Sequence, residues 1–406
     1  MSNGFRLTLA QLNPTVGALA ENAQKARDAW AQARDAGAHM IAFTEMFISG
    51  YQIQDLVRRQ AFVAQAMEEI DRLAADRADG PAIGIGGPYW DGSRLFNAYH
   101  ICEGGRVTAR VLKHKLPNND VFDEVRLYTA GDIHGPYAIG PLRIGTPICE
   151  DAWTPDVAEA QAESGAHILL VPNGSPYHRG KQEERIGLMV SRVIETGLPL
   201  VYVNMVGGQD DQVFDGGSFV LNPGGHLMAQ LPVFEEVVTH VDFVEGEDGW
   251  EAVQTDLASH PDAMEQDYRT MVMGLRDYVR KTGFAKVVLG LSGGVDSALV
   301  ATIAADALGA DNVHCVMLPS EYTSQESLED AAGVAERLGC KLDSLPISGP
   351  RDAVSEALAP FFEGRNSDIT EENVQSRLRG LLLMALSNKF GEMRLTTGYK
   401  SEVAVG

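Results

Sequence analysis

The feature that most constrains the fold is the stretch 286–298, where an apolar run leads through two glycines into a helix-like segment. Gly293 and Gly294 permit backbone conformations and close approaches that a side chain forbids. The free N–H groups of a helix start, with the hydroxyls of Ser292 and Ser297, suit a pyrophosphate group. The Gly-Lys-Ser/Thr ending of a Walker A loop is missing. We therefore expect a strand–loop–helix unit of a parallel α/β sheet with a phosphate-binding loop of another kind.

The spacing of apolar runs divides the chain into two α/β regions. Up to about Leu231, short apolar runs alternate with amphipathic segments, as in layered α/β proteins. The strands predicted there are Leu7–Gln11, Met40–Phe43, Ile83–Gly86, Ala98–Cys102, Val107–Leu112, Ile144–Ile148, Ile168–Val171, Val201–Asn204 and Ser218–Leu221. The predicted helices are Ala20–Asp35, Leu56–Ala75, Thr154–Glu163 and Lys181–Thr196.

From about Ala258 the helices become longer and alternate with single strands, which is typical of a doubly wound parallel sheet. The strands predicted in this second region are Val287–Leu291, Val313–Leu318, Leu342–Ile347 and Arg394–Thr397. The predicted helices are Ala263–Thr282, Asp296–Leu308, Ser324–Leu338, Asp352–Phe362 and Glu371–Phe390.

An acidic segment separates the two regions. Between Glu235 and Asp256 there are eight acidic residues and no Lys or Arg, which indicates an exposed strand end followed by a linker. The predicted domains are residues 1–245 and 263–406, joined by a linker over 246–262. Another helix is expected to begin near Gly406, so we predict that the sequence is truncated at its C-terminus.

Composition limits the partners and the cellular setting. Hydrophobic residues make up 45% of the chain, which excludes wholesale disorder. The 33 Lys and Arg residues against 56 Asp and Glu give a net charge of −23, which argues against a protein that coats nucleic acid. No apolar run reaches the roughly 18 residues of a membrane span, and the first residues lack the apolar stretch that is typical of a signal peptide. With four scattered cysteines, we expect a cytoplasmic protein with neither a nucleic-acid nor a membrane partner.

Three predicted strands of the first region end in reactive side chains. One ends at Glu45, one leads to Lys113 and Lys115, and one ends at Cys149. An ammonium group lowers the pKa of a neighbouring thiol, and a carboxylate can then act as general base and acid. Taken singly, such a cysteine is more often buried filler, and such a glutamate or lysine is usually solvated. Strand alternation places both lysines on the same face, so spacing leaves the choice between them open.

The Cys-Glu-Asp-x-Trp element at Cys149, with Glu45 and the lysine segment, resembles the nitrilase (carbon–nitrogen hydrolase) superfamily over roughly the first 240 residues. The resemblance implies an α-β-β-α sandwich and a Glu-Lys-Cys triad with Glu45 as base and Cys149 as nucleophile. Its Lys-x-x-Leu pattern favours Lys113 as the lysine. It also implies that Glu124 holds that lysine within the glutamine site, and that Ser175 and Lys181 bind glutamine.

The Ser-Gly-Gly-Val-Asp-Ser string at 292–297 resembles the N-type ATP pyrophosphatases, which activate an acid as an adenylate. The order of the two regions resembles the glutamine-dependent NAD synthetase family. This implies glutamine, ATP and deamido-NAD⁺ as substrates, Mg²⁺ as cofactor, and a homo-oligomer, either a dimer through the synthetase region or larger. The implied ATP-binding residues are Leu291, Ser292, Gly293, Gly294, Val295, Asp296, Ser297 and Thr397. The implied deamido-NAD-binding residues are Asn373, Arg377, Arg379, Lys400 and Glu402, with Asp296 and Glu402 as metal ligands.

Some alternatives remain at the level of sequence. One is an amidotransferase that delivers ammonia to a different adenylated acceptor, and another is a nucleotide-sensing protein with a stand-alone amidase. Arg377 and Arg379 lie two positions apart on a predicted helix, so their side chains diverge, and such arginines are usually solvated. An assay with deamido-NAD⁺ and with rival acceptors separates the enzymes, and pyrophosphate release separates an enzyme from a sensor.

Overall fold

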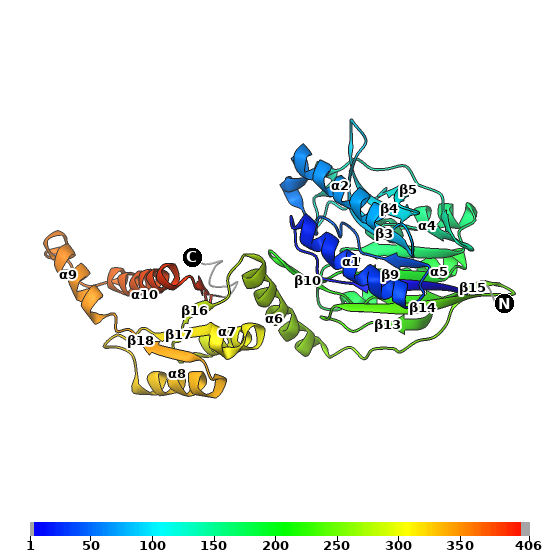
Figure 1. Ribbon diagram of the computed structural model, residues 1–406. Coiled ribbons are helices and arrows are strands. Elements are labelled where there is room, and N and C mark those ends of the chain that lie inside the picture. Colours follow the sequence, from blue (N-terminus) through cyan, green and yellow to red (C-terminus); the bar gives the residue numbers. More distant parts are fainter. Residues whose placement is uncertain (1–3, 399–406) are drawn as a thin grey trace. The chain divides into compact units, whose positions relative to one another are not determined.

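The computed structural model describes residues 4–398, which fall into two compact units that divide between Thr270 and Met271 (Figure 1). The division lies within a helix, α6 (Ala263–Lys281). Within residues 4–398 the helices are all too short or too polar to cross a lipid bilayer.

The first unit contains two large β-sheets. One has seven strands in the order β15-β14-β1-β2-β3-β4-β5, and the other has six in the order β13-β12-β9-β8-β7-β6. The strands of the first sheet are β1 (Gly4–Gln11), β2 (Met40–Ala42), β3 (Ala82–Trp90), β4 (Leu95–Glu103), β5 (Arg106–Leu112), β14 (Val237–Gly246) and β15 (Gly249–Ala252). Those of the second are β6 (Tyr137–Ile139), β7 (Leu142–Gly145), β8 (Ile168–Asn173), β9 (Leu200–Asn204), β12 (Phe219–Asn222) and β13 (His226–Gln230).

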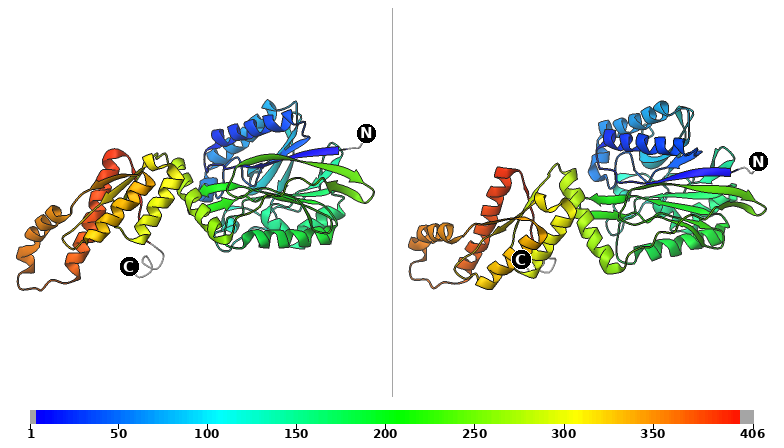
Figure 2. Two further views of the ribbon diagram at one scale, coloured as in Figure 1. Left: turned by 90° about the horizontal axis from the view of Figure 1, so that it is seen from below. Right: turned by 60° about the horizontal axis from the view of Figure 1, so that its bottom comes forward.

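The two sheets pack face to face with helices on both outer faces (Figure 2). Apolar side chains such as Leu7, Tyr99, Ile144 and Val201 fill the space between the sheets. On one outer side lie α1 (Leu19–Asp35) and α2 (Gln60–Asp76), and on the other lie α4 (Pro155–Glu163) and α5 (Lys181–Thr196). The predicted α-β-β-α sandwich is therefore confirmed.

Short elements complete the first unit. A hairpin of β10 (Val206–Gln209) and β11 (Gln212–Asp215) forms a separate two-stranded sheet. The 3₁₀ helices η1 (Gln54–Arg58) and η2 (Cys149–Ala152) and the short helix α3 (Glu124–Leu127) lie in the connections. Two of these connections carry residues of the candidate triad and its partners.

The second unit is built on a parallel sheet in the order β18-β17-β16-β19. Its strands are β16 (Val287–Gly290), β17 (Val313–Met317), β18 (Lys341–Ser344) and β19 (Met393–Arg394). The connecting elements are α7 (Val295–Leu308), η3 (Ala310–Asn312), α8 (Gln325–Leu338), α9 (Ser348–Phe362) and α10 (Ile369–Phe390). Residues of α7 and α8 pack on one face of the sheet and residues of α10 on the other, as predicted for a doubly wound sheet.

The structure differs from the predicted elements at several places, among them the predicted strand Arg394–Thr397, which is found at Met393–Arg394. The predicted helix 56–75 is broken at Arg59, which has an extended backbone between η1 and α2. The predicted strand 144–148 ends at Gly145, because the chain turns toward η2. The predicted linker includes a strand, β15, because Trp250 is buried against the first sheet and the turn after Gly246 returns the chain to pair with β14.

Candidate active site

Glu45 follows β2 in the first unit and is fully buried. Its Oε1 accepts hydrogen bonds from Lys113 Nζ at 2.7 Å and from Asn97 Nδ2 at 2.7 Å. Its Oε2 accepts a hydrogen bond from the backbone N–H of Gly174 at 3.0 Å. Three donors from three different segments therefore fix the orientation of this carboxylate.

Lys113 lies between two carboxylates and is also fully buried. Its Nζ is 2.7 Å from Glu45 Oε1 and 2.8 Å from Glu124 Oε2. Burial alone would lower the pKa of Lys113, but the two carboxylates outweigh it and raise that pKa well above its ordinary value. Glu124 is held in turn by Tyr51 Oη at 2.9 Å and Asn97 Nδ2 at 3.1 Å. The lysine is therefore held in place between two carboxylates that favour its charged form.

The structure separates Lys113 from Lys115. Strand β5 ends at Leu112, so the alternation that would place both side chains on one face does not extend to them. Lys115 points to the surface, where its Nζ is 2.5 Å from Asp156 Oδ2 and its side chain is 35% exposed. Only Lys113 contacts the buried carboxylates, which agrees with the choice that the nitrilase resemblance favours.

Cys149 begins η2 with φ = +48°, the left-handed region that a residue with a side chain rarely adopts. Its thiol is buried, and it interacts electrostatically with Glu45, Lys113 and Glu124. Burial and then the Glu45 carboxylate raise the pKa of the thiol, although Lys113 opposes them. The expected lowering of the thiol pKa by the ammonium group is therefore outweighed in this site by burial and by Glu45.

Asp151 holds the turn that carries Cys149. Its Oδ2 accepts a hydrogen bond from Ile148 N–H at 3.0 Å, and its Oδ1 accepts from His114 N–H at 3.0 Å and Lys115 N–H at 2.6 Å. These bonds join the turn of the nucleophile to the segment that follows Lys113. Burial raises the pKa of Asp151 to about 6, even though the three N–H donors oppose that shift.

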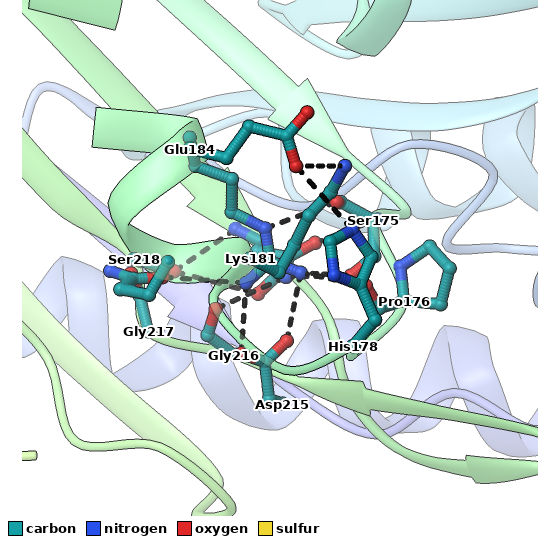
Figure 3. Close-up of polar contacts among 12 residues, drawn as sticks. Ser175, Pro176, His178, Lys181, Glu184, Asp215, Gly216, Gly217 and Ser218 are labelled. Atoms are coloured by element: carbon teal, nitrogen blue, oxygen red, sulfur yellow. Dashed lines mark hydrogen bonds and ion pairs between the residues drawn. The ribbon is translucent and has the colours of Figure 1, made fainter. Parts of the chain in front are cut away.

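A cavity of about 640 Å³ opens onto Cys149 in the first unit. Ser175 and Lys181 line it, together with Glu150, Trp153 and Glu184 among other residues. Lys181 Nζ lies 4.2 Å from the centre of the Trp153 ring and 3.0 Å from Glu184 Oε2. Figure 3 shows Ser175, Lys181 and Glu184 close together in this region. The wall of the cavity thus carries both a cation and carboxylates.

Glu124 has a different position from the residues of this wall. It is 3% exposed, contacts Lys113, and lines a smaller cavity of about 190 Å³ with Tyr51 and Arg126. The nitrilase resemblance implies that Glu124 holds Lys113, and the contacts of Glu124 are consistent with that role. Glu124 lies apart from Ser175 and Lys181.

Sequence reasoning missed Asn97, Gly174 and the contacts of Asp151. Asn97 is a buried polar residue in the largely apolar sequence of β4. A polar residue within such a run is the one sequence signal that could have indicated a role for it. Gly174 contributes a backbone N–H, which no side chain pattern reveals. These residues come from segments far apart in the chain, so only the packed sheets bring them to Glu45.

In the second unit, the predicted phosphate-binding loop connects β16 to α7. Ser297 Oγ lies 3.0 Å from Ser292 Oγ and accepts a hydrogen bond from Ser292 N–H at 3.1 Å. Gly293 has φ = +85°, and an added Cβ would overlap the backbone carbonyl oxygen of Ser327. Val295 and Asp296 are exposed at the start of α7. Glycine is therefore required at 293 for both its conformation and its lack of a side chain.

A cavity of about 280 Å³ adjoins this loop, and four of the predicted residues line it: Leu291, Ser292, Arg379 and Thr397. Arg379 also donates a hydrogen bond from Nε to the carbonyl oxygen of Leu318 at 3.2 Å. Arg377 is exposed and donates to the carbonyl oxygen of Asn373, which is also exposed. The two arginines diverge as predicted, and the structure brings only Arg379 to the cavity.

Two predicted residues, Lys400 and Glu402, lie outside the described residues. Among residues 4–398 there is no group of three His, Cys, Asp or Glu side chains that could hold a metal ion. Asp296 is exposed at the N-terminus of α7, next to the glycine loop. A single carboxylate beside a phosphate-binding loop fits Mg²⁺, because this ion keeps several waters and binds substrate phosphates.

The chain matches two known families over most of its length. The carbon-nitrogen hydrolase family model matches residues 6–246, and the NAD synthase family model matches residues 267–406. A glutamine-dependent NAD(+) synthetase from Rhodobacter capsulatus is 62% identical over 406 residues, covering 100% of this chain and 74% of that protein. The chain belongs to the glutamine-dependent NAD(+) synthetase family.

Solved structures agree with this membership. The glutamine-dependent NAD+ synthetase from Acinetobacter baumannii in complex with ADP has a TM-score of 0.94 at 38% identity, covering 100% of this chain and 76% of that one. An amidase from Nesterenkonia sp. has a TM-score of 0.53 at 26% identity, covering 59% of this chain and 89% of that one. The function is thus glutamine-dependent synthesis of NAD⁺, with a nitrilase-like glutaminase domain and an NAD synthase domain, and these matches do not support a different acceptor. ATP is a co-substrate in this family.

Proposed function

We propose that Cys149 is the glutaminase nucleophile, Glu45 its general base and acid, and Lys113 the cation that stabilises the oxyanion. The observation that carries this proposal is the burial of Lys113 between Glu45 and Glu124, beside a thiol at the end of a cavity. A buried cation between two carboxylates is costly unless it is fully paired, so its presence next to a nucleophile supports a chemical role.

The contacts support the following sequence of steps. Glu45 takes the thiol proton as Cys149 Sγ attacks the side-chain carbonyl carbon of glutamine, and Lys113 with the Glu150 N–H stabilises the oxyanion. Glu45 then gives its proton to the nitrogen as the C–N bond breaks, which releases ammonia and leaves a glutamyl thioester. Glu45 next takes a proton from water, whose oxygen attacks the thioester. Cleavage of the C–S bond, with return of the proton to sulfur, releases glutamate.

The cavity wall supports the recognition of glutamine itself. The α-amino acid end of glutamine carries one positive and one negative charge. Lys181 supplies a cation and Glu150 and Glu184 supply carboxylates along the wall, and Ser175 supplies a hydroxyl and backbone groups. We assign Ser175 and Lys181 to glutamine binding, and Glu124 to the support of Lys113 from behind.

In the second domain we assign the 291–297 loop and Thr397 to ATP. The nicotinate carboxylate of deamido-NAD⁺ would attack the α-phosphorus and displace pyrophosphate, and ammonia would then attack the resulting adenylate to give NAD⁺ and AMP. Free N–H groups at the start of α7 and the Ser292 hydroxyl support phosphate binding. Arg379 supports contact with a bound nucleotide because it lines the same cavity. The roles of Asn373, Arg377, Lys400 and Glu402 toward deamido-NAD⁺ rest on the family resemblance.

We further propose that Asp296 holds Mg²⁺ together with the phosphates of ATP, with Glu402 as a second ligand. When bound, Mg²⁺ would neutralise the charge that develops on the departing pyrophosphate. The exposed position of Asp296 at the start of α7 supports this role. Titration of the protein with Mg²⁺ and ATP, comparing the wild-type protein with Asp296→Asn, measures this contribution directly as binding affinity.

The decisive experiment for the glutaminase roles is Cys149→Ala, with Cys102→Ala as the matched control at another buried cysteine. We expect Cys149→Ala to abolish NAD⁺ synthesis from glutamine, while synthesis from added ammonium survives. Cys102→Ala, which lies in β4, should retain both activities. Persistent use of glutamine by Cys149→Ala would show that the nucleophile lies elsewhere, and loss of both activities in a folded variant would refute the scheme of two sites.

We also propose that the protein forms a homo-oligomer and works in the cytoplasm. Exposed apolar side chains on α10, such as Ile369, Leu381 and Phe390, support a subunit interface in the synthetase domain. All four cysteines are free and lie within residues 4–398, which supports a reducing compartment. Light scattering coupled to size-exclusion chromatography tests the first proposal, and cell fractionation tests the second.

A further inference from the structure

A buried ion pair lies beside the glutamine cavity but outside the candidate triad. Arg185, on α5, and Asp215, at the end of β11, are each 1% exposed. Arg185 Nη1 donates a hydrogen bond to Asp215 Oδ2 at 2.9 Å, and Nη2 is 2.9 Å from Asp215 Oδ1. A buried pair of this kind rarely gains stability over apolar residues, so its presence calls for another explanation.

The guanidinium group of Arg185 also holds the loop that follows β8. Its Nε donates to Ser175 Oγ at 3.1 Å, and its Nη2 donates to the carbonyl oxygens of Ser175 at 2.8 Å and Pro176 at 3.0 Å. Ser175 and Pro176 both line the glutamine cavity. Figure 3 shows these two residues and Asp215 gathered in the same small region. Arg185 thus holds one wall of the cavity from behind.

Asp215 connects Arg185 to the β10–β11 hairpin, another part of the cavity wall. It ends the β10–β11 hairpin, whose residues Gln212 and Val213 line the same cavity. The carbonyl oxygen of Val213 accepts a hydrogen bond from Tyr177 N–H at 2.7 Å, which joins the loop to the hairpin a second time. The ion pair therefore joins two neighbouring segments of the cavity wall, the loop at Ser175–Pro176 and the β10–β11 hairpin.

We propose that Arg185 is a specificity-determining positioning residue of the glutaminase site, which fixes the Ser175–Pro176 segment of the cavity wall against the β10–β11 hairpin. The inference rests on the proposed glutamine cavity next to Cys149. Two of the three contacts that orient Glu45 come from Asn97 and Lys113, which Arg185 does not contact, and the third comes from the backbone N–H of Gly174, next to Ser175. Loss of Arg185 should therefore weaken the binding of glutamine far more than it slows the chemical steps.

A lysine cannot replace this arginine. The planar guanidinium group directs its N–H groups to Ser175, Pro176 and Asp215 at the same time, whereas an ammonium group is a compact charge with three donors on a flexible stem. Arg185→Lys keeps the charge opposite Asp215 but loses the fixed fork. Each hydrogen bond to glutamine that the displaced wall no longer makes weakens binding by up to about tenfold, so we expect glutamine KM to rise by about 10- to 100-fold.

The test compares Arg185→Lys with Arg192→Lys in the full protein. Arg192 lies on the same helix and is 5% exposed, and its Nη2 donates to Glu195 on that helix. The measurements are kcat and KM for glutamine hydrolysis, and the rate at which iodoacetamide alkylates Cys149, followed by peptide mass spectrometry with and without glutamate. Alkylation by this small reagent reports on the nucleophile, and protection by glutamate reports on the cavity.

For Arg185→Lys we expect KM to rise while kcat changes by less than about threefold. An interaction that stabilises the bound substrate and the transition state equally affects KM alone when it is lost. The alkylation rate without glutamate should stay the same, and the concentration of glutamate that protects should rise in parallel with KM. Arg192→Lys should behave like the wild-type protein. An unchanged KM, or a loss confined to kcat together with slower alkylation, would overturn the inference.

If Arg185→Lys does not fold, Asp215→Asn tests the other end of the pair. The variant places an amide N–H₂ group against the guanidinium group, which should release the hairpin and raise KM in the same way. A wild-type KM in a folded Asp215→Asn protein would count against the inference. A failure of the glutaminase assignment itself is distinguishable, because Cys149→Ala would then still hydrolyse glutamine.

Discussion

The comparison of Lys113→Met with Lys115→Met gives a quantitative test of the electrostatics of the site. Methionine keeps most of the length of the side chain and removes the charge. At Lys113 the change leaves Glu45 and Glu124 buried without the cation that lies 2.7 and 2.8 Å from their oxygens. Breaking a buried pair by removing one partner costs about 3–5 kcal/mol. At about 2–4 °C per kcal/mol for a unit of this size, the Tm of the first unit should fall by roughly 6–20 °C.

The effect on catalysis should be equally distinct. Loss of one group that stabilises an oxyanion lowers kcat by about 10²- to 10³-fold, and we expect Lys113→Met to reach the upper end because it also loosens Glu45. Lys115→Met removes only a partly exposed pair with Asp156, and such pairs contribute about 0–1 kcal/mol. Its kcat should stay within a factor of about 2 of the wild-type value, since Lys115 does not contact the carboxylates.

The assay is glutamate release, measured well below the lower Tm, with synthesis of NAD⁺ from ammonium as the control for an intact second unit. Thermal unfolding followed by fluorescence gives the stability of each variant. The reasoning would be refuted by equal losses in the two variants. A Lys113→Met protein that keeps a tenth of the wild-type kcat would refute it as well.

Three further predictions concern other groups. Burial raises the pKa of Asp151 to about 6. The stability that the protonated carboxyl group contributes is therefore present below the ordinary pKa near 3.8 and is lost as the pH rises through about 6. Asp151→Asn should flatten this part of the curve of unfolding free energy against pH, and an unchanged curve would contradict the raised pKa. Gly293→Ala should abolish pyrophosphate release, because the new Cβ would overlap the Ser327 carbonyl oxygen, while release of glutamate continues. Asp296→Asn should weaken the binding of Mg²⁺ with ATP and should also slow pyrophosphate release. Each tenfold decrease in rate corresponds to about 1.4 kcal/mol of activation free energy. Pyrophosphate release at the wild-type rate would exclude Asp296 as a Mg²⁺ ligand.

Local sequence patterns were sufficient for the positions of the reactive side chains. Glu45 lies three residues after the end of β2 and Cys149 four residues after the end of β7, so each follows a buried strand closely without ending it. The strand–loop–helix unit at 286–298 was equally readable, because an apolar run leads through the Ser-Gly-Gly-Val-Asp-Ser string into a helix start. The fold class followed from the same alternation of strands and helices.

Patterns of this kind failed where the periodicity stopped or where the contact was distant. The alternation that made Lys113 and Lys115 equivalent does not apply after Leu112, where β5 ends. Asn97 and Gly174 reach Glu45 from positions 52 and 129 residues away, so their contacts leave no local trace. The choice of Lys113 came from the family resemblance, and the geometry then supplied its physical reason.

The presence of two buried glutamates around one lysine has an explanation in the charge balance of the proposed reaction. Before attack, Lys113 lies against both Glu45 and Glu124, and the proposed reaction starts from a neutral Cys149 thiol because burial raises its pKa. After attack, Glu45 has taken the proton and is neutral, and the negative charge lies on the oxyanion. Lys113 then has lost one carboxylate partner at the moment when it must stabilise new charge. Glu124, which keeps its contact at 2.8 Å and takes no part in the proton transfer, holds the ammonium group in place through that step.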